Sequence, residues 1–146
     1  MAVQENKALA AQLMDEVMNK GNVALIDRLA TQNFIDHASM PGMPAGRDGV
    51  KAFVTGFRAA FPDLHYTTDD VVAEGDKVVQ RSTGRGTMRG DFMGMPASGK
   101  SASWQEIHIT RFAEGKAVEH WAVVDQYSML TQLGFVGQES KVGAGH

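Results

Sequence analysis

Cysteine is absent from the 146-residue chain, which excludes disulfide bonds, thiolate nucleophiles and zinc–thiolate sites. Net charge is also small, −3 at pH 7, whereas a protein that coats nucleic acid needs a basic face. No apolar run approaches the roughly 20 residues of a membrane span, and the first residues are acidic and lack the apolar segment of a signal peptide. We therefore expect a cytoplasmic protein that binds neither nucleic acid nor a membrane.

What the chain does contain suits one globular domain. Hydrophobic residues make up 43% of it and charged residues 21%, which are ordinary proportions for a folded protein with a core. Its length is typical of one domain, and no stretch has the composition of a linker. We expect a single domain over residues 1–146, with an ordered core at about 5–135 and a flexible tail at 136–146.

The first half of the sequence has the periodicity of helices. Apolar residues recur at steps of three and four over residues 4–19 and, most clearly, over residues 47–61, where Pro62 predicts the end of the helix. Between these segments, Asn22 is a candidate N-cap for a short second helix. The stretch "NFIDHA" has the alternation of a short strand.

The second half alternates with a period of two, as strands do. Four strands are expected, which pair as two hairpins: residues 64–73, 77–88, 102–112 and 117–125. A last short helix follows at 126–133, with Gly134 as its stop. This order of elements predicts an α+β domain whose helices pack on one face of an antiparallel sheet.

One stretch, "GMPASGKS" at residues 94–101, matches the Walker A pattern of nucleotide-binding P-loops. A P-loop lies between a buried strand and a helix, because the helix N-terminus and the loop amides hold the phosphates. The residues before Gly94 form no continuous hydrophobic strand, and those after Ser101 alternate with a period of two. We therefore interpret the match as a glycine-rich connection between strands.

The second hairpin predicts a face that mixes aromatic and ionisable side chains. If Glu114 and Gly115 form the turn, Ala113 faces Lys116, and alternation then places six residues on one face: Trp104, Glu106, His108, Glu119, Trp121 and Asp125. The opposite face is aliphatic and better suited to packing against helices. Since a solvent-exposed face rarely carries both tryptophans of a chain, the mixed face predicts the wall of a small-molecule site, unless the register is shifted by one residue.

Two residues of this face are candidates for acid–base catalysis, and each has a structural alternative. Asp125 lies beside the tryptophans, where partial desolvation suits a carboxyl group to proton transfer. It also immediately precedes the last helix and is well placed as its N-cap. His108 is either catalytic or a buried imidazole that Glu106 or a backbone carbonyl satisfies.

Other histidines carry weaker signals. Alternation in "NFIDHA" places His37 on the same side of its strand as Asn33, whereas His120 is expected to face away from Asp125 in a structural role. A metal held by His37, His108 and Asp125 is chemically possible. No two histidines have the HxH or HxxxH spacing of metal ligands, however, and we expect no metal.

The segments "AFPDLH", "EGDKVV", "FMGMPASGK" and "GKAVEHW" together resemble the SnoaL-like polyketide cyclases, which belong to the wider nuclear-transport-factor-2-like fold class. The resemblance covers about residues 5–135. It implies a cone-shaped, barrel-like α+β domain in which a curved antiparallel sheet and three to four helices enclose a deep pocket.

The resemblance also implies a function. In such cyclases an aspartate on a late strand is the general acid/base of an intramolecular aldol ring closure, a histidine assists, and no metal or cofactor is used. By position the aspartate is Asp125 and the histidine is His108. The implied substrate-binding residues are Asn33, His37, Trp104, Glu106 and Trp121.

Two other functions fit the same residues. One is a hydrolase or isomerase that acts on a small carbonyl or epoxide compound, with Asp125 as the base and a histidine orienting water. The other is a binding domain that holds an apolar ligand without turnover. In each case the expected partner is a small apolar or polyketide-like compound, and the resemblance further implies a homodimer.

Overall fold

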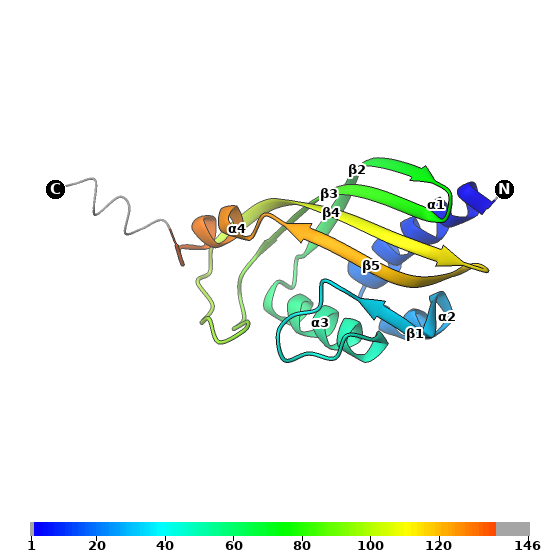
Figure 1. Ribbon diagram of the computed structural model, residues 1–146. Helices are drawn as coiled ribbons and strands as arrows, with labels where there is room; N and C mark the ends of the chain where they lie inside the picture. Colours follow the sequence, from blue (N-terminus) through cyan, green and yellow to red (C-terminus); the bar gives the residue numbers. More distant parts are fainter. Residues whose placement is uncertain (1, 137–146) are drawn as a thin grey trace.

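The computed structural model describes residues 2–136 and has the α+β architecture that the sequence predicts. Five strands form one open sheet in the order β1–β5–β4–β3–β2, and helices α1 to α3 lie against one of its faces (Figure 1). The expected flexible tail, residues 136–146, lies outside the described residues except for residue 136.

The N-terminal helix changes its winding partway. Helix α1 spans Ala2–Gln12 and continues as a π-helical turn, Leu13–Met18. A short 3₁₀ turn, Val23–Leu25, then leads into helix α2, Ile26–Leu29. Asn22 occupies the predicted N-cap position, but its side chain forms no capping hydrogen bond.

Helix α3, Arg47–Ala60, is the amphipathic helix predicted over residues 47–61. Its buried stripe includes Val54 and Phe57, and Pro62 prevents the helix from continuing. The last helix, α4, spans Gln126–Leu133 and ends at Gly134, whose φ of 94° lies in the left-handed region that favours glycine. No helix of residues 2–136 is long and apolar enough to cross a membrane.

Four strands follow the predicted boundaries to within one residue: β2 His65–Glu74, β3 Lys77–Thr87, β4 Ser101–Ala113 and β5 Lys116–Val124. Strand β1, Ala30–Asp36, begins three residues before the predicted "NFIDHA" strand and ends two residues before its end. Strands β2 to β5 form an antiparallel meander, but β1 pairs in parallel with β5. The expected all-antiparallel sheet is therefore wrong in one respect, because the sheet is mixed. Since β4 begins at Ser101, no P-loop helix follows "GMPASGKS".

The β4–β5 hairpin begins in the predicted register and then leaves it. Its two turn residues, Glu114 and Gly115, have positive φ values of 50° and 79°, as a tight two-residue hairpin turn requires. Beyond Phe112 and Ala117, which still pair as predicted, Val118 is an extra residue on β5. This β-bulge shifts every later pair by one position.

The bulge reverses the face to which most of β5 points. His108 pairs with Ala122 instead of Trp121, so Trp121 and Asp125 do not share the face of Glu106 and His108, and the predicted common face is wrong. The face with Trp104, Glu106 and His108 is also the one that the helices cover. The bulge divides the predicted packing face. On β4 this face is exposed to solvent, where 46% of Ile107 is accessible, whereas Val124 on β5 packs against the buried core as predicted.

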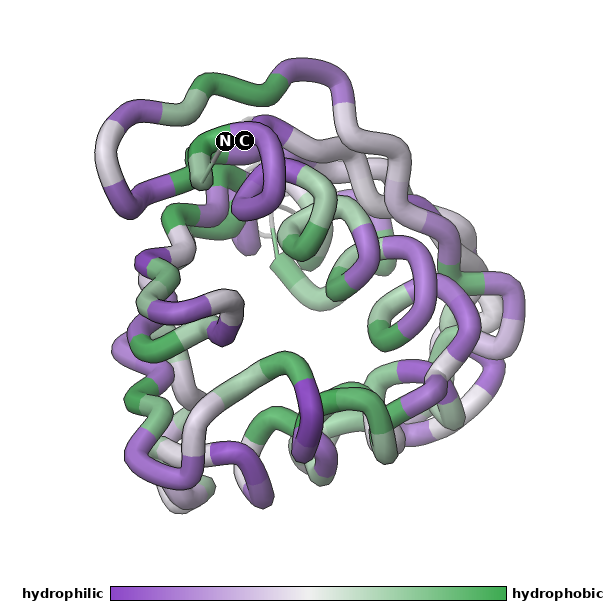
Figure 2. Tube along the Cα trace, turned by 90° about the vertical axis from the view of Figure 1, so that its right-hand side faces the viewer, coloured by the Kyte–Doolittle hydropathy of each residue, from purple (hydrophilic) through white to green (hydrophobic). Residues whose placement is uncertain are grey.

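Buried residues between sheet and helices form two clusters, one around Phe57, Phe61 and Trp104 and the other around Ile26, Phe34 and Val54. Viewed from the side in Figure 2, the Cα trace runs around a central region, and hydrophobic and hydrophilic residues alternate along much of it. This alternation is the amphipathic pattern that directs one side of each element inward.

Candidate functional site

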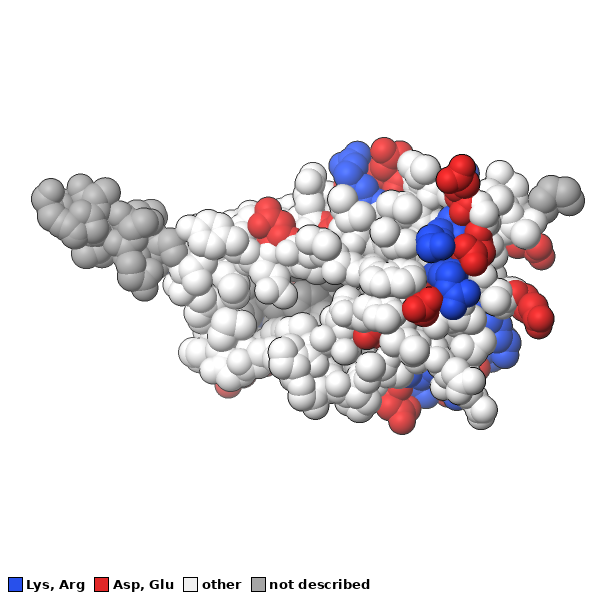
Figure 3. All heavy atoms as spheres, viewed as in Figure 1, with Lys and Arg blue, Asp and Glu red and all other residues white. Residues whose placement is uncertain are grey.

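A cavity of about 290 Å³ lies between the inner face of the sheet and the helices. We call it the main cavity. Its lining is mostly aliphatic, aromatic and methionine side chains and includes neither lysine nor arginine. Figure 3 shows a hollow in one face of the molecule, with mostly uncharged residues around it. A concave apolar site with a few polar groups is the usual form of a small-molecule site.

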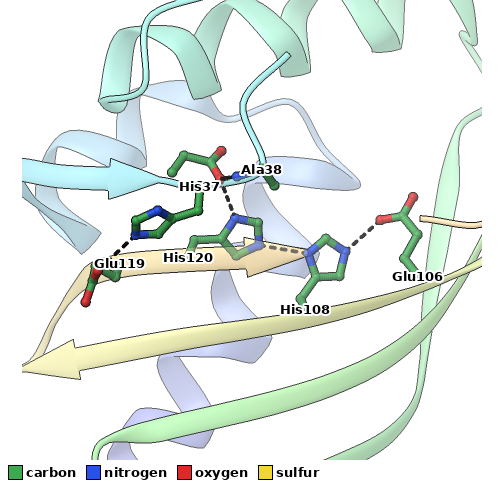
Figure 4. A network of polar contacts seen from close by, with 7 residues as sticks. His37, Ala38, Glu106, His108, Glu119 and His120 are labelled. Atoms are coloured by element: carbon green, nitrogen blue, oxygen red, sulfur yellow. Dashed lines mark hydrogen bonds and ion pairs between the residues drawn. The ribbon is translucent and has the colours of Figure 1, made fainter. Parts of the chain in front are cut away.

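Four ionisable side chains of the main cavity form one hydrogen-bonded chain, which we call the relay: Glu106, His108, His120 and Asp36. Figure 4 shows Glu106, His108 and His120 following one another in a line. Glu106 Oε1 lies 2.6 Å from His108 Nε2, and His108 Nδ1 lies 2.8 Å from His120 Nε2. His120 Nδ1 then lies 2.9 Å from Asp36 Oδ1. Three neighbouring strands, β4, β5 and β1, therefore contribute to one continuous chain.

The relay holds a fixed number of protons. Each of its three hydrogen bonds needs one proton between its two heavy atoms. Two bare carboxylates and two bare imidazole rings carry four negative charges, and three protons leave a net charge of −1. Moving each proton across its own bond changes which group is charged without changing this total.

Glu106 anchors the buried end of the relay. Its second oxygen, Oε2, accepts hydrogen bonds from the Tyr66 hydroxyl at 2.9 Å and from Trp104 Nε1 at 2.7 Å. Burial raises the pKa of Glu106, but the hydrogen bonds from His108, Trp104 and Tyr66 outweigh burial and hold the pKa below its ordinary value. Glu106 is therefore ionised, because its neighbours compensate for the lost water.

Two further features support this anchor. Burial and, next, the charge of Glu106 raise the pKa of Tyr66 well above its ordinary value, so the phenol stays protonated and donates. Gly84 lies directly below the two rings, and a Cβ there would come within 2.7 Å of Tyr66 and 2.9 Å of Trp104. Only glycine leaves room for both rings to reach Glu106.

Asp36 forms the other end of the relay. Its Oδ1 accepts from His120 and from the Ala38 amide, which lies 2.9 Å away. Burial raises the pKa of Asp36. The hydrogen bond and charge of His120 and the hydrogen bond from the Ala38 amide outweigh burial, so the pKa lies below its ordinary value. No described residue donates to Asp36 Oδ2, so this oxygen is available to a ligand.

Three predicted site residues line the main cavity: Trp104, Glu106 and His108. The structural alternative for His108, in which Glu106 satisfies the imidazole, is also correct, because the two side chains are hydrogen-bonded. His108 nevertheless keeps 14% of its side chain accessible. The same ring is thus held by a carboxylate and exposed to the cavity.

The structure does not bring the other four predicted residues into the main cavity. Asn33 is exposed on the outer side of β1. His37 stacks on Trp121 outside the sheet, with ring centroids 4.9 Å apart. Asp125 is exposed and accepts a hydrogen bond from the Ser128 amide at 3.1 Å, which confirms the alternative that it caps α4.

Sequence reasoning missed Asp36 and assigned His120 a structural role. A signal for Asp36 was present in "NFIDHA", because Phe34 is the largest apolar residue of that strand and alternation places Asp36 on its side. The expectation that His120 faces away from Asp125 was correct, but the inference that it is structural did not follow. Without the bulge, nothing indicated that His120 points toward His108.

The relay is not arranged as a metal site. Its side chains follow one another in a line, and no group of three or more histidine, aspartate or glutamate side chains in residues 2–136 could hold a metal ion. The three donors suggested by the sequence do not converge either, because His37 lies outside the sheet and Asp125 caps a helix. Proton transfer is the chemistry that this geometry supports.

Comparison with known protein families identifies the fold and the family. The family model described as SnoaL-like polyketide cyclase covers residues 8–133 of this chain. No curated protein matches the chain.

Solved structures of the same fold cover nearly the whole chain. TsrD from Streptomyces laurentii is 31% identical with a TM-score of 0.79, over 89% of this chain and 98% of that one. IdmH from Streptomyces antibioticus, described as a candidate polyketide cyclase, is 31% identical with a TM-score of 0.77, over 88% and 98%. A candidate polyketide cyclase from Bacillus cereus ATCC 10987 is 28% identical with a TM-score of 0.79, over 91% and 83%.

Proposed function

The chain belongs to the SnoaL-like polyketide cyclase family, and from this premise we propose that it catalyses intramolecular aldol ring closure of a small, largely apolar carbonyl compound. The observation that carries the proposal is the relay, which is the polar chain on the wall of an otherwise apolar cavity. An aldol closure needs a base for an acidic C–H next to a carbonyl and an acid for the new alkoxide. A proton relay supplies both.

The geometry favours Asp36 as the base. Asp36 Oδ2 has no donor among the described residues, whereas both oxygens of Glu106 accept hydrogen bonds. In the proposed step, Asp36 takes the proton from the carbon next to a carbonyl. The resulting enolate carbon forms a bond to the second carbonyl carbon of the same molecule, whose oxygen becomes an alkoxide.

The histidines complete the reaction. The proton that bridges His108 and His120 passes to the alkoxide. After the product leaves, Asp36 releases its new proton to water, and the histidine pair takes one proton from water. Protons balance, and the relay returns to its first state. The apolar walls exclude water and hold the two reacting carbons together, so proximity supplies much of the acceleration.

The test is proton exchange and ring closure on a model compound, an aromatic ketone with a 1,3-diketone side chain. Exchange at the acidic carbon is followed in deuterated water by NMR, and closure by chromatography. We expect Asp36→Asn and His108→Gln to lose about 100-fold or more in both rates. Asp125→Asn is the control and keeps wild-type rates.

Two outcomes contradict the proposal. If Asp36→Asn and His108→Gln both keep wild-type rates, the relay is not catalytic, and a ligand-holding role is favoured. If Asp125→Asn loses activity while these two keep it, the aspartate predicted from the sequence is the base after all.

A further inference from the structure

A second, smaller cavity of about 100 Å³ opens beside the main cavity, and we call it the side cavity. The two share five lining residues: Met40, Phe57, Phe92, Gln126 and Met129. Side chains common to both linings form the boundary at which the two cavities meet. Within it, the rings of Phe57 and Phe92 lie 5.1 Å apart.

The side cavity differs chemically from the main cavity. Its own lining residues are all apolar: Phe61, Met88, Met93, Met95, Leu130 and Leu133. Among residues 2–136 no charged side chain lines it, and Gln126, at the boundary between the cavities, is its one polar lining residue. Polar chemistry is thus confined to the relay side, and the side cavity offers only apolar contact.

Size limits what each cavity can hold. An apolar cavity of about 150 Å³ binds benzene, which has six carbons. On this scale the side cavity takes about four carbons and the main cavity about a dozen non-hydrogen atoms, the size of two fused rings. At the outer end of the side cavity, 48% of Met93 is exposed, so a longer chain would pass Met93 into solvent.

We propose that the side cavity is a subsite for a short apolar substituent, and that the substrate is a two-ring carbonyl compound with an unbranched chain of about four carbons. This inference deepens the proposed function, because it places the carbonyl against the relay and the chain beyond Phe57 and Phe92. The methionines around the side cavity suit a flexible chain, because thioether side chains adapt their packing.

The test is a series of 2-acylnaphthalenes whose alkyl chains have from one to about seven carbons beyond the carbonyl, with binding measured by calorimetry. Each methylene that enters the side cavity should lower Kd about fourfold. The gain should stop after about four carbons, where the chain reaches Met93 and solvent. A Kd that falls evenly along the whole series, or does not change with chain length, would overturn the assignment.

Two substitutions at Leu130 test whether the gain in affinity with chain length arises in the side cavity. Leu130 lines only the side cavity and is partly exposed on α4, so changes there should be tolerated. Leu130→Phe fills the space and should abolish the gain beyond about one carbon, whereas Leu130→Ala enlarges it and should extend the gain by about two carbons. If both variants keep the wild-type profile, the chain does not occupy the side cavity.

Met43→Phe is the matched control, because Met43 lines only the main cavity. It should weaken every member of the series by a similar factor and leave the chain-length dependence unchanged. The series measures binding and is repeated with His108→Gln. If Kd does not depend on chain length but His108→Gln abolishes ring closure, the subsite is overturned alone. If Kd depends on chain length as expected but His108→Gln keeps wild-type ring closure, the proposed reaction is overturned alone.

Discussion

The sheet carries a histidine–carboxylate cluster on each of its two faces, at almost the same level. Inside is the relay. Outside is a cluster that we call the outer cluster, in which Glu119 accepts from His37 at 2.9 Å and from Arg111 at 2.7 Å, and His37 stacks on Trp121. Each cluster has histidine–carboxylate contacts of 2.6 to 2.9 Å. The outer cluster, however, contains an arginine in place of a second histidine, and it does not line the main cavity.

The two clusters differ in what surrounds them. In the relay, burial acts against the charge of Glu106, and three donors are needed to keep it ionised. In the outer cluster, the hydrogen bonds from His37 and Arg111 lower the pKa of Glu119 more than burial raises it, and 40% of the His37 side chain is accessible to water. We therefore expect proton-transfer chemistry at the relay, on the wall of an apolar cavity, and not at the solvent-exposed outer cluster.

The largest difference in stability and in exchange rate is expected between Glu106→Gln and Glu119→Gln. The first removes the charge that three donors satisfy, and we expect a loss of about 3 kcal/mol in unfolding free energy and about 100-fold in the exchange rate. The second should change neither quantity much, because surface ion pairs contribute little. Urea denaturation and the exchange assay measure both, and equal effects of the two substitutions would remove the distinction.

Acid should reduce the contribution of the relay to folding stability more than that of the outer cluster. The pKa of Glu106 and of Asp36 is lower in the folded protein than in the unfolded chain, so the unfolded chain binds protons more tightly at low pH. Stability is then complete above about pH 5 and falls as the pH decreases through about 4 toward the lowered pKa values.

The acid effect is measured as the urea midpoint from pH 7 to pH 3 in wild type and two variants. Asp36→Asn should flatten the acid side of the curve, because its pH-dependent contribution is gone. Glu119→Gln should flatten it less, since solvent screens the outer cluster. If the urea midpoint falls more steeply with acid in Asp36→Asn than in wild type, the pKa of Asp36 is not lowered by folding, and the prediction is wrong.

A smaller effect is expected at Asp125, which belongs to neither cluster. Asp125→Ala removes the cap of α4 and should cost about 1 kcal/mol, whereas Asp125→Asn keeps a side-chain acceptor and should cost little. Thermal unfolding followed by circular dichroism separates the two. Both variants should retain ring closure, and a loss of activity in the asparagine variant alone would contradict the capping role.

The smallest effect is expected at His37. His37→Ala removes the stack on Trp121 and one donor to Glu119, and we expect a loss of about 0.5 kcal/mol in unfolding free energy with no change in exchange rate. Activity that depends on His37 would mean that the outer cluster takes part in catalysis, and the contrast between the two faces would fail.

Much of the fold could be predicted because it depends on local patterns. Periodicity located α3 and the four strands of the meander, and Glu114–Gly115 located the tight turn. The parallel pairing of β1 with β5 could not be predicted in this way, since it joins residues about 85 positions apart in the chain. Strand identity is a local property, whereas strand partners are not.

The candidate site was predicted only on β4. Trp104, Glu106 and His108 follow from simple alternation, and all three line the main cavity. On β5 the same reasoning failed beyond Val118, because the bulge contains no glycine or proline that would have signalled it. Because this one extra residue has no sequence signal, alternation predicted that Trp121, and not His120, lies beside His108.

Val118 has a consequence in genetic terms. Since side chains alternate along β5, loss of one codon between Ala117 and Glu119 would restore the simple register and exchange the two sets of side chains. Trp121 would then point toward His108, and His120 would face solvent. Which side chains of β5 face the cavity thus depends on a one-residue insertion. A comparison of substitutions at fixed positions would overlook such a change.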